Sequence, residues 1–166
     1  MRTIILDGYN VIYKIPELTS KLNESLEAAR IALAMLLSTW KKKYLYSRVY
    51  IVFDGKDNVT REYPQTKKVC GIDCCFTGGG EEADERIITL IRDYGDSSEI
   101  TVISDDNKVR NNCKAFGVKA ESPSFLQEPG MKSKNSKKEP IKIISTKKDR
   151  EITAYYANYL KQKGRL

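Results

Sequence analysis

The chain has 166 residues, a net charge of +7 and no histidine, and charged side chains make up 31% of it. Its length fits one domain, and its mean hydropathy of −0.50, without any run of about 18 apolar residues, excludes a membrane-spanning helix. Because histidine is absent, Ser-His-Asp and Cys-His catalysis and histidine zinc sites are excluded as well.

The first predicted elements are a strand and a long helix. Residues 3–6 are apolar and mostly β-branched, which is typical of a buried strand, and Asp-Gly-Tyr-Asn at residues 7–10 indicates a turn. From residue 24 to residue 43 apolar side chains recur at helical spacing, and the lysines at 41–43 suit a helix C-terminus. The apolar start is too short for a secretion signal, so we expect a cytoplasmic protein.

Two more strands and a second long helix follow. Residues 49–53 predict a buried strand, the polar stretch up to Lys68 a loop or arm, and residues 69–76 a weaker strand that contains three of the four cysteines. Glycines at 78–80 end that strand, and a helix with an acidic first turn covers residues 81–94. The cysteines lack a CxxC spacing, so we expect packed, reduced thiols rather than a zinc site or disulfides.

The alternation continues with a strand at 100–103 and a helix at 107–116. A short fifth strand at 118–120 and a helical turn at 123–127 complete the series. Strands that alternate with helices form parallel βαβ units. The sequence therefore predicts an α/β domain over residues 1–128, with three α/β/α layers and a central, mostly parallel sheet of four to five strands.

The last part of the chain is strongly basic. Residues 129–140 have the composition of a flexible linker, and residues 141–166 form a basic extension whose helix we expect to dock on the domain. Residues 130–166 carry eleven Lys or Arg against three Asp or Glu, which accounts for the whole positive excess. Such a tail favours a polyanionic partner, namely nucleic acid or the ribosome, over a tail that only aids solubility.

Acidic residues follow the predicted ends of four strands. The carboxyl ends of parallel strands meet at one edge of a sheet, where open α/β folds bind ligands, so we expect these side chains to converge. Crowded carboxylates favour a hard divalent cation, Mg²⁺ or Mn²⁺, which can activate water for attack on a phosphodiester. Each acid alone is equally compatible with a helix cap or turn residue. The candidate ligands are Asp7, Asp54, Glu81, Asp84, Asp105 and Asp106, with Asn10 as a further polar group.

Several short motifs occur in an order that resembles a known family. Asp-Gly-Tyr-Asn-Val-Ile at 7–12, after an N-terminal strand, resembles the opening of NYN domains, a branch of the PIN-like nuclease superfamily. Val-Phe-Asp-Gly at 52–55, Thr77 with Glu-Ala-Asp-Glu-Arg-Ile at 82–87, and Val-Ile-Ser-Asp at 102–105 continue the likeness. The spacing over residues 1–128 is most similar to the YacP-like subgroup.

The resemblance implies a PIN-like fold and a metal-dependent endoribonuclease that cuts mRNA in association with the ribosome. It implies that Asp7, Asp84 and Asp105 are the catalytic metal-binding acids, that Asn10 lies beside them, and that Asp54 is an acid typical of the subgroup. The glutamate that PIN relatives use corresponds to Glu81 or Glu82, and the sequence does not choose between them.

Basic and aromatic side chains would hold single-stranded RNA at this acidic edge through phosphate contacts and base stacking. Two alternative functions stay open. One is a non-catalytic RNA- or ribosome-binding module on the same fold. The other is a phosphatase for small molecules, which the basic tail and the missing second Asp after Asp7 disfavour. The candidate RNA-binding residues are Tyr9, Tyr13, Arg61, Lys67, Lys68, Lys108 and Arg110.

Overall fold

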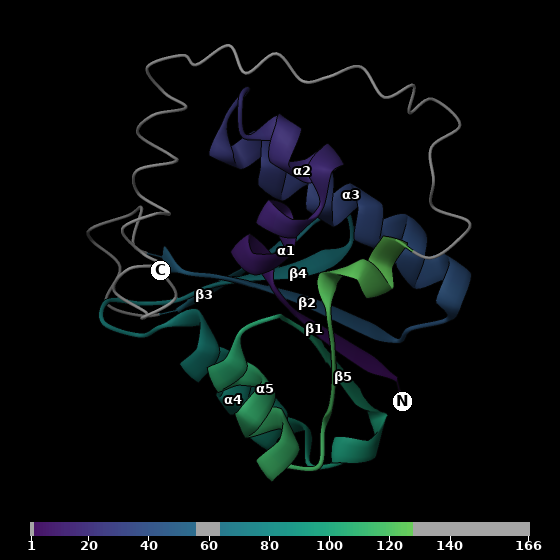
Figure 1. Cartoon of the computed structure of the whole chain (residues 1–166), viewed down its shortest axis with the longest axis vertical. Helices are drawn as coiled ribbons and strands as arrows, with labels where there is room; N and C mark the ends of the chain where they lie inside the picture. Colours follow the sequence, from purple (N-terminus) through teal and green to yellow (C-terminus); the bar gives the residue numbers. More distant parts are fainter. Residues whose placement is uncertain (1, 56–63, 128–166) are drawn as a thin grey trace.

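The computed structural model describes residues 2–55 and 64–127, and the statements below concern these residues. A six-stranded sheet with the order β3-β4-β2-β1-β5-β6 lies between two layers of helices (Figure 1). The strands are β1 (Thr3–Asp7), β2 (Arg48–Phe53), β3 (Gln65–Val69), β4 (Ile72–Phe76), β5 (Ile100–Ile103) and β6 (Lys119–Glu121). The α-helices are α1 (Gly8–Lys14), α2 (Pro16–Lys21), α3 (Leu26–Tyr44), α4 (Ala83–Tyr94) and α5 (Asn107–Ala115), with 3₁₀ helices at Ser97–Glu99 and Pro123–Gln127.

The sheet is parallel except at one edge, as the sequence predicts. Strand β1 pairs in parallel with β2 and β5 in the middle of the sheet, and β4 and β6 extend it in parallel on either side. Only β3 is antiparallel, paired with β4. In this register Asp7, the last residue of β1, lies opposite Val52 near the end of β2. The carboxyl ends of five strands therefore meet at one edge.

The sheet has one strand more than expected, because the stretch predicted as a loop up to Lys68 forms β3. Cys70 and Gly71, with φ of 51° and 77°, make a tight turn that splits the predicted 69–76 strand into a β3–β4 hairpin. The side chains of β3 are exposed apart from the half-buried Val69. Lysines on an exposed edge strand discourage pairing with other chains, so β3 lacks the apolar pattern by which buried strands are recognised.

Two short helices replace the predicted turn after β1. Asp7 caps α1, with its Oδ1 accepting from the backbone N–H of Asn10 at 3.4 Å. Pro16 occupies the first turn of α2, where its missing N–H costs nothing. Helices of six or seven residues contain too few periodic positions to stand out in a sequence.

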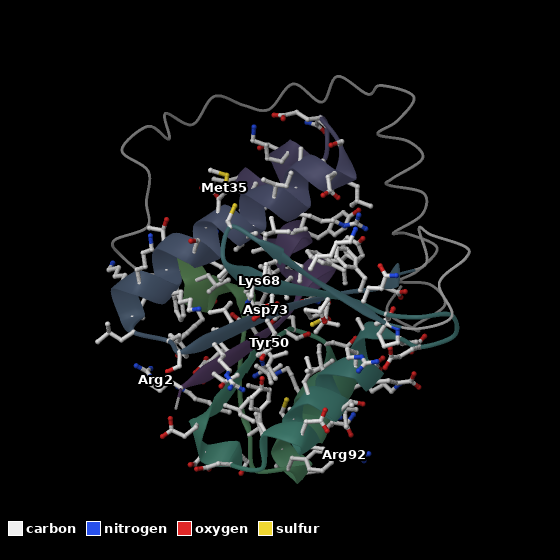
Figure 2. The ribbon with its side chains drawn as sticks, turned by 180° about the vertical axis from the view of Figure 1, so that it is seen from behind. Arg2, Met35, Tyr50, Lys68, Asp73 and Arg92 are labelled. Atoms are coloured by element: carbon white, nitrogen blue, oxygen red, sulfur yellow. The ribbon has the colours of Figure 1, made fainter. Side chains whose placement is uncertain are left out.

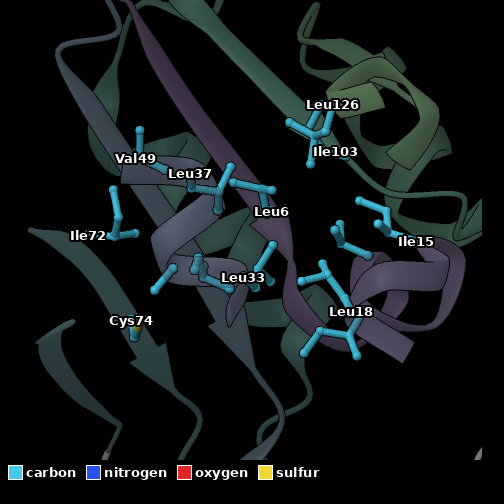
Figure 3. Packing of buried hydrophobic residues seen from close by; sticks show 14 of the residues in the cluster. Leu6, Ile15, Leu18, Leu33, Leu37, Val49, Ile72, Cys74, Ile103 and Leu126 are labelled. Atoms are coloured by element: carbon cyan, nitrogen blue, oxygen red, sulfur yellow. The ribbon is translucent and has the colours of Figure 1, made fainter. Parts of the chain in front are cut away.

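Each face of the sheet has its own hydrophobic core. On one face, α1, α2 and α3 cover the sheet; Figure 3 shows Leu33 and Leu37 of α3 beside Leu6 of β1. On the other face, Ile87 of α4 and Cys113 of α5 pack against the sheet. Because both faces are covered, the central strands are held firmly and their ends have fixed positions.

Some sequence predictions lie outside the described residues. These are the 129–140 linker, the basic extension at 141–166 with its helix, and Arg61. Within the described residues, no helix has both the length and the apolar character needed to cross a membrane.

Candidate active site

Asp7 is the centre of a hydrogen-bonded group at the carboxyl ends of β1 and β5. The hydroxyl of Ser104, the residue after β5, donates to Asp7 Oδ2 at 3.2 Å. The Asn10 side-chain Oδ1 accepts from the backbone N–H of Asp105 at 2.9 Å. Two chain segments almost a hundred residues apart are thereby tied together, as the parallel topology predicts.

The neighbouring acids Asp105 and Asp106 make different contacts. Asp106 is 5% exposed, and its Oδ1 caps α5 by accepting from the backbone N–H groups of Lys108 at 2.7 Å and Val109 at 3.3 Å. Its own N–H donates to Ser104 Oγ at 3.0 Å. The Asp105 carboxylate is more exposed, and Lys14 Nζ of α1 lies 3.8 Å from its Oδ2. Of the two acids, Asp106 is therefore the more buried and the more extensively hydrogen-bonded.

Asp84 comes to the same edge from the start of α4, on the other side of the fold from α1. It is buried at 4% exposure, and its Oδ2 lies 2.6 Å from Lys108 Nζ. The same ammonium group is 3.7 Å from Glu82 Oε2. The packing of α4 beside α5 thus gives this buried carboxylate a lysine as its neighbour.

The pKa of Asp7 reflects its burial first and the neighbouring carboxylates second. Burial, together with the charges of Asp106 and Asp84, raises the pKa of Asp7 from 3.8 to about 6, although hydrogen bonds from the Asn10 N–H and the Ser104 hydroxyl act in the opposite direction. Asp7, Asp84 and Asp106 therefore interact electrostatically at one edge.

The other acids singled out from the sequence are Glu81, its alternative Glu82, and Asp54. Both Nε and Nη2 of Arg86 donate to Glu81 Oε2, at 3.2 and 3.0 Å, so the charge of Glu81 is already paired. Glu82 forms the capping box of α4 with Glu85. Asp54 is buried at 3% exposure after β2, where the adjacent Gly55 N–H donates to Thr77 Oγ1 at 2.8 Å.

The donor chemistry of this edge fits Mg²⁺ or Mn²⁺. Carboxylate, hydroxyl and amide oxygens are the ligands such cations prefer, and a cation would offset both the burial of the Asp7 charge and its repulsion by Asp106 and Asp84. In residues 2–55 and 64–127, however, no three Asp, Glu or Cys side chains stand together as a ready-made metal site. In this conformation Lys108 lies beside Asp84 and Lys14 lies beside Asp105.

The candidate RNA-binding residues are spread over the molecule. Tyr9 is 9% exposed, packs on Phe53 with ring centroids 5.2 Å apart and accepts a hydrogen bond from Arg30, so its ring belongs to the core in this conformation. Tyr13 is half-buried and packs against the same core. Neither ring is presented as an open platform for a base.

The basic candidates divide into two groups. Lys67 and Lys68 lie on β3, and Lys68 pairs with Asp73 of β4 at 2.6 Å; Figure 2 shows these two side chains next to each other. Lys108 contacts Asp84, and Arg110 Nη1 donates to the carbonyl of Ser104 at 3.2 Å. Lys108 and Arg110 are thus the predicted basic residues that reach the carboxylate edge.

Sequence reasoning missed two groups that shape this edge, Ser104 and Lys14. The sequence signal for Ser104 was its place between the end of a buried strand and two acids, where a hydroxyl can orient a carboxylate. Lys14 gave no signal, because its approach to Asp105 depends on the course of α1, which the sequence did not predict.

Comparisons with known proteins agree with the fold and the motifs. The family model described as the YacP-like NYN domain matches residues 4–164. The uncharacterized protein YacP of Bacillus subtilis is 34% identical over 90 residues, which are 54% of this chain and 51% of that protein. The match therefore spans about half the length of this relative.

Two crystal structures of Rae1 (YacP) from Bacillus subtilis are similar to this fold. A mutant form has a TM-score of 0.62 and 26% identity, covering 76% of this chain and 73% of the other. A second structure has a TM-score of 0.60 and 22% identity over 99% of this chain and 84% of the other, a likeness that concerns the fold alone.

Proposed function

The chain belongs to the YacP-like NYN domain family, a nuclease-type domain, and from this premise we propose that it is a metal-dependent endoribonuclease. The proposed substrate is single-stranded RNA, specifically mRNA in association with the ribosome. The observation that carries the proposal is the approach of Asp7 to the buried Asp84 and Asp106 at the carboxyl edge, where the Ser104 hydroxyl joins Asp7 to the backbone of Asp106.

In the proposed reaction, Asp7, Asp84 and the Asp105–Asp106 pair would hold Mg²⁺ or Mn²⁺. When bound, such a cation supplies a Lewis acid that lowers the pKa of water and offsets charge on the phosphodiester. The Ser104 hydroxyl and the Asn10 N–H orient the carboxylate of Asp7. Asn10 Oδ1 fixes the backbone at Asp105.

The basic groups at the edge offset its repulsion of RNA. Lys14, Lys108 and Arg110 each contact either an acid or the backbone beside it. Their positive charge lowers the cost of bringing a phosphodiester to a carboxylate-rich edge. The basic residues of 130–166 would add affinity for RNA that is independent of sequence.

A second candidate function is a non-catalytic RNA- or ribosome-binding module on the same fold. One observation favours it: within the described part of the chain, no three carboxylates form a ready-made metal site. In that case the acids would be structural, with Asp7 and Asp106 serving as helix caps.

Cleavage by the full chain distinguishes the two functions. Purified protein is incubated with free single-stranded RNA, or with a translated mRNA and ribosomes, in Mn²⁺, Mg²⁺ or chelator. We expect metal-dependent cuts that Asp7→Asn reduces by about 10²–10³-fold. Asp93→Asn is the matched control, because this exposed acid of α4 lies outside the site and its change should leave cleavage unaltered.

Binding supplies the contrary outcome. If neither protein cuts RNA while both bind RNA or ribosomes tightly, the endoribonuclease proposal is wrong and the binding module is correct. Hydrolysis of a small phosphate ester without RNA cleavage would instead indicate a phosphatase.

A further inference from the structure

Lys108 has an unusual place at the carboxylate edge. Its ammonium group lies 2.6 Å from Asp84 Oδ2 and 3.7 Å from Glu82 Oε2. The Asp84 side chain is 3% exposed, whereas the Lys108 side chain is 55% exposed. A cation therefore reaches a buried carboxylate from the solvent side.

The stability of α5 does not account for a lysine at this position. Lys108 is the second residue of α5, where the helix dipole favours negative rather than positive charge. Its backbone N–H is directed to Asp106 Oδ1 at 2.7 Å, so the main chain satisfies the cap while the side chain extends to Asp84. Lys108 thus contacts Asp106 through its backbone and Asp84 through its side chain. Because the helix cap needs only the backbone N–H, we assign the side chain to the neutralisation of Asp84.

An ammonium group and a divalent cation need the same oxygen of Asp84. Lysine is a compact charge on a flexible stem, and a half-exposed lysine can move into water at modest cost. Because a lysine side chain is charged at neutral pH, the 2.6 Å contact places a counter-ion on Asp84 when no other cation is there.

On the premise of the proposed metal-dependent nuclease, we propose that Lys108 is an internal counter-ion that a divalent cation must displace from Asp84. Because the two compete, Lys108 lowers the metal affinity of the edge while keeping the buried carboxylate neutralised in the metal-free protein. The residue is thus a determinant of metal affinity, a role distinct from contact with RNA.

The test is the affinity of the metal-free full chain for Mn²⁺, measured by titration calorimetry without RNA. We expect Lys108→Gln to bind Mn²⁺ about tenfold more tightly than the unmodified chain. Lys114→Gln is the matched control, because it removes the same charge from an exposed position on the same helix and should leave the affinity unchanged. Lys108→Arg keeps the positive charge and should retain the Mn²⁺ affinity of the unmodified chain. If the lysine side chain had only a structural role, its charge would not determine that affinity.

A second readout is thermal melting with and without Mn²⁺, which also establishes that each variant is folded. Because ligand stabilisation grows with affinity, Mn²⁺ should raise the Tm of Lys108→Gln more than that of the unmodified chain. Equal Mn²⁺ affinities in the unmodified chain and Lys108→Gln would overturn the inference and leave the nuclease proposal intact. Absence of Mn²⁺ binding in every variant would overturn both. Weaker RNA binding by Lys108→Gln at unchanged Mn²⁺ affinity would show that Lys108 is an RNA contact instead.

Discussion

Among single residues, Asp7 couples the fold to pH. Its pKa is raised to about 6 because burial disfavours the charged form and the Asp106 and Asp84 carboxylates repel it. The folded protein therefore binds a proton at Asp7 more strongly than the unfolded chain, where the pKa is 3.8. This stabilisation is complete below the unfolded pKa and is lost as pH rises through about 6, at a cost of at most about 3 kcal/mol.

Asp7→Asn should consequently stabilise the metal-free protein at neutral pH. The amide cannot ionise, so the variant avoids the cost that the carboxylate incurs above about pH 6. Urea unfolding in chelator at about pH 7.5 and about pH 4 measures the difference, which should shrink toward acid pH. Asp93→Asn should change stability little at either pH. A gain from Asp7→Asn that is equal at both pH values would contradict the pKa argument.

Among the elements, α1 is the one whose position sets the site, because its first residue follows Asp7 and its start lies very close to β2. A Cβ atom at Gly8 would lie 2.4 Å from Phe53 Cε1 and 2.9 Å from Ile51 Cγ2. Both neighbours are fully buried, so neither can move freely. Glycine is therefore required for the close contact between α1 and β2.

Gly8→Ala should destabilise the protein by about 1–3 kcal/mol, the usual cost of overpacking, and should also reduce cleavage because α1 moves together with Asp7. Urea midpoints and cleavage rates measure the two effects. Gly71→Ala is the control: its Cβ meets nothing within 4 Å, so the change costs only about 1 kcal/mol for the positive φ and spares cleavage. A smaller effect at Gly8 than at Gly71 would show that the contact with β2 is not limiting.

The elements differ in how well the sequence predicted them. The strand at 100–103 and the 3₁₀ turn at 123–127 have the predicted bounds, because polar residues that commonly end strands and helices flank both of them. The edge strand β3 escaped prediction because its exposed polar residues carry no burial pattern. The periodic pattern of apolar residues in a sequence reflects which side chains are buried. An edge strand or a two-turn helix has too few buried positions to produce a recognisable pattern.

The parts of the site also differ in how far the sequence predicts them. Acids at the strand ends were predictable, because parallel topology alone brings those ends together. The contact of Lys108 with Asp84 was not, because it depends on how α5 packs beside α4. Likewise, only the packed structure shows that Asp106, rather than its neighbour Asp105, is among the acids that raise the pKa of Asp7.

For the molecule as a whole, the sheet separates two hydrophobic cores, and the exposure of each core can be followed through a different type of side chain. Trp40 of α3, the only tryptophan, is 2% exposed in the core between α3 and the sheet and stacks on Tyr46 with ring centroids 4.8 Å apart. Cys113 is fully buried in the opposite core, and burial raises its pKa to about 11. Cys70 is the exposed cysteine, at the β3–β4 turn. Cys74 lies in the same core as Trp40, so the buried thiols report on the opposite core alone only when Cys74 is replaced.

We expect both cores to unfold together, because the central strands contribute side chains to each face and neither helical layer can keep its contacts without the sheet. A variant with Cys70→Ser and Cys74→Ala keeps Cys75 and Cys113, both in the core under α4 and α5. Its native form should be almost inert to a thiol reagent, whereas the unmodified chain should show one rapidly reacting thiol. Across a denaturant series, thiol reactivity of the variant and Trp40 fluorescence should then change with the same midpoint. Thiol exposure at lower denaturant, before Trp40 fluorescence changes, would mean that the α4–α5 layer opens separately. Asp84 and Lys108 would leave the site in that opening, since α4 and α5 carry them, while Asp7 stayed in place on β1.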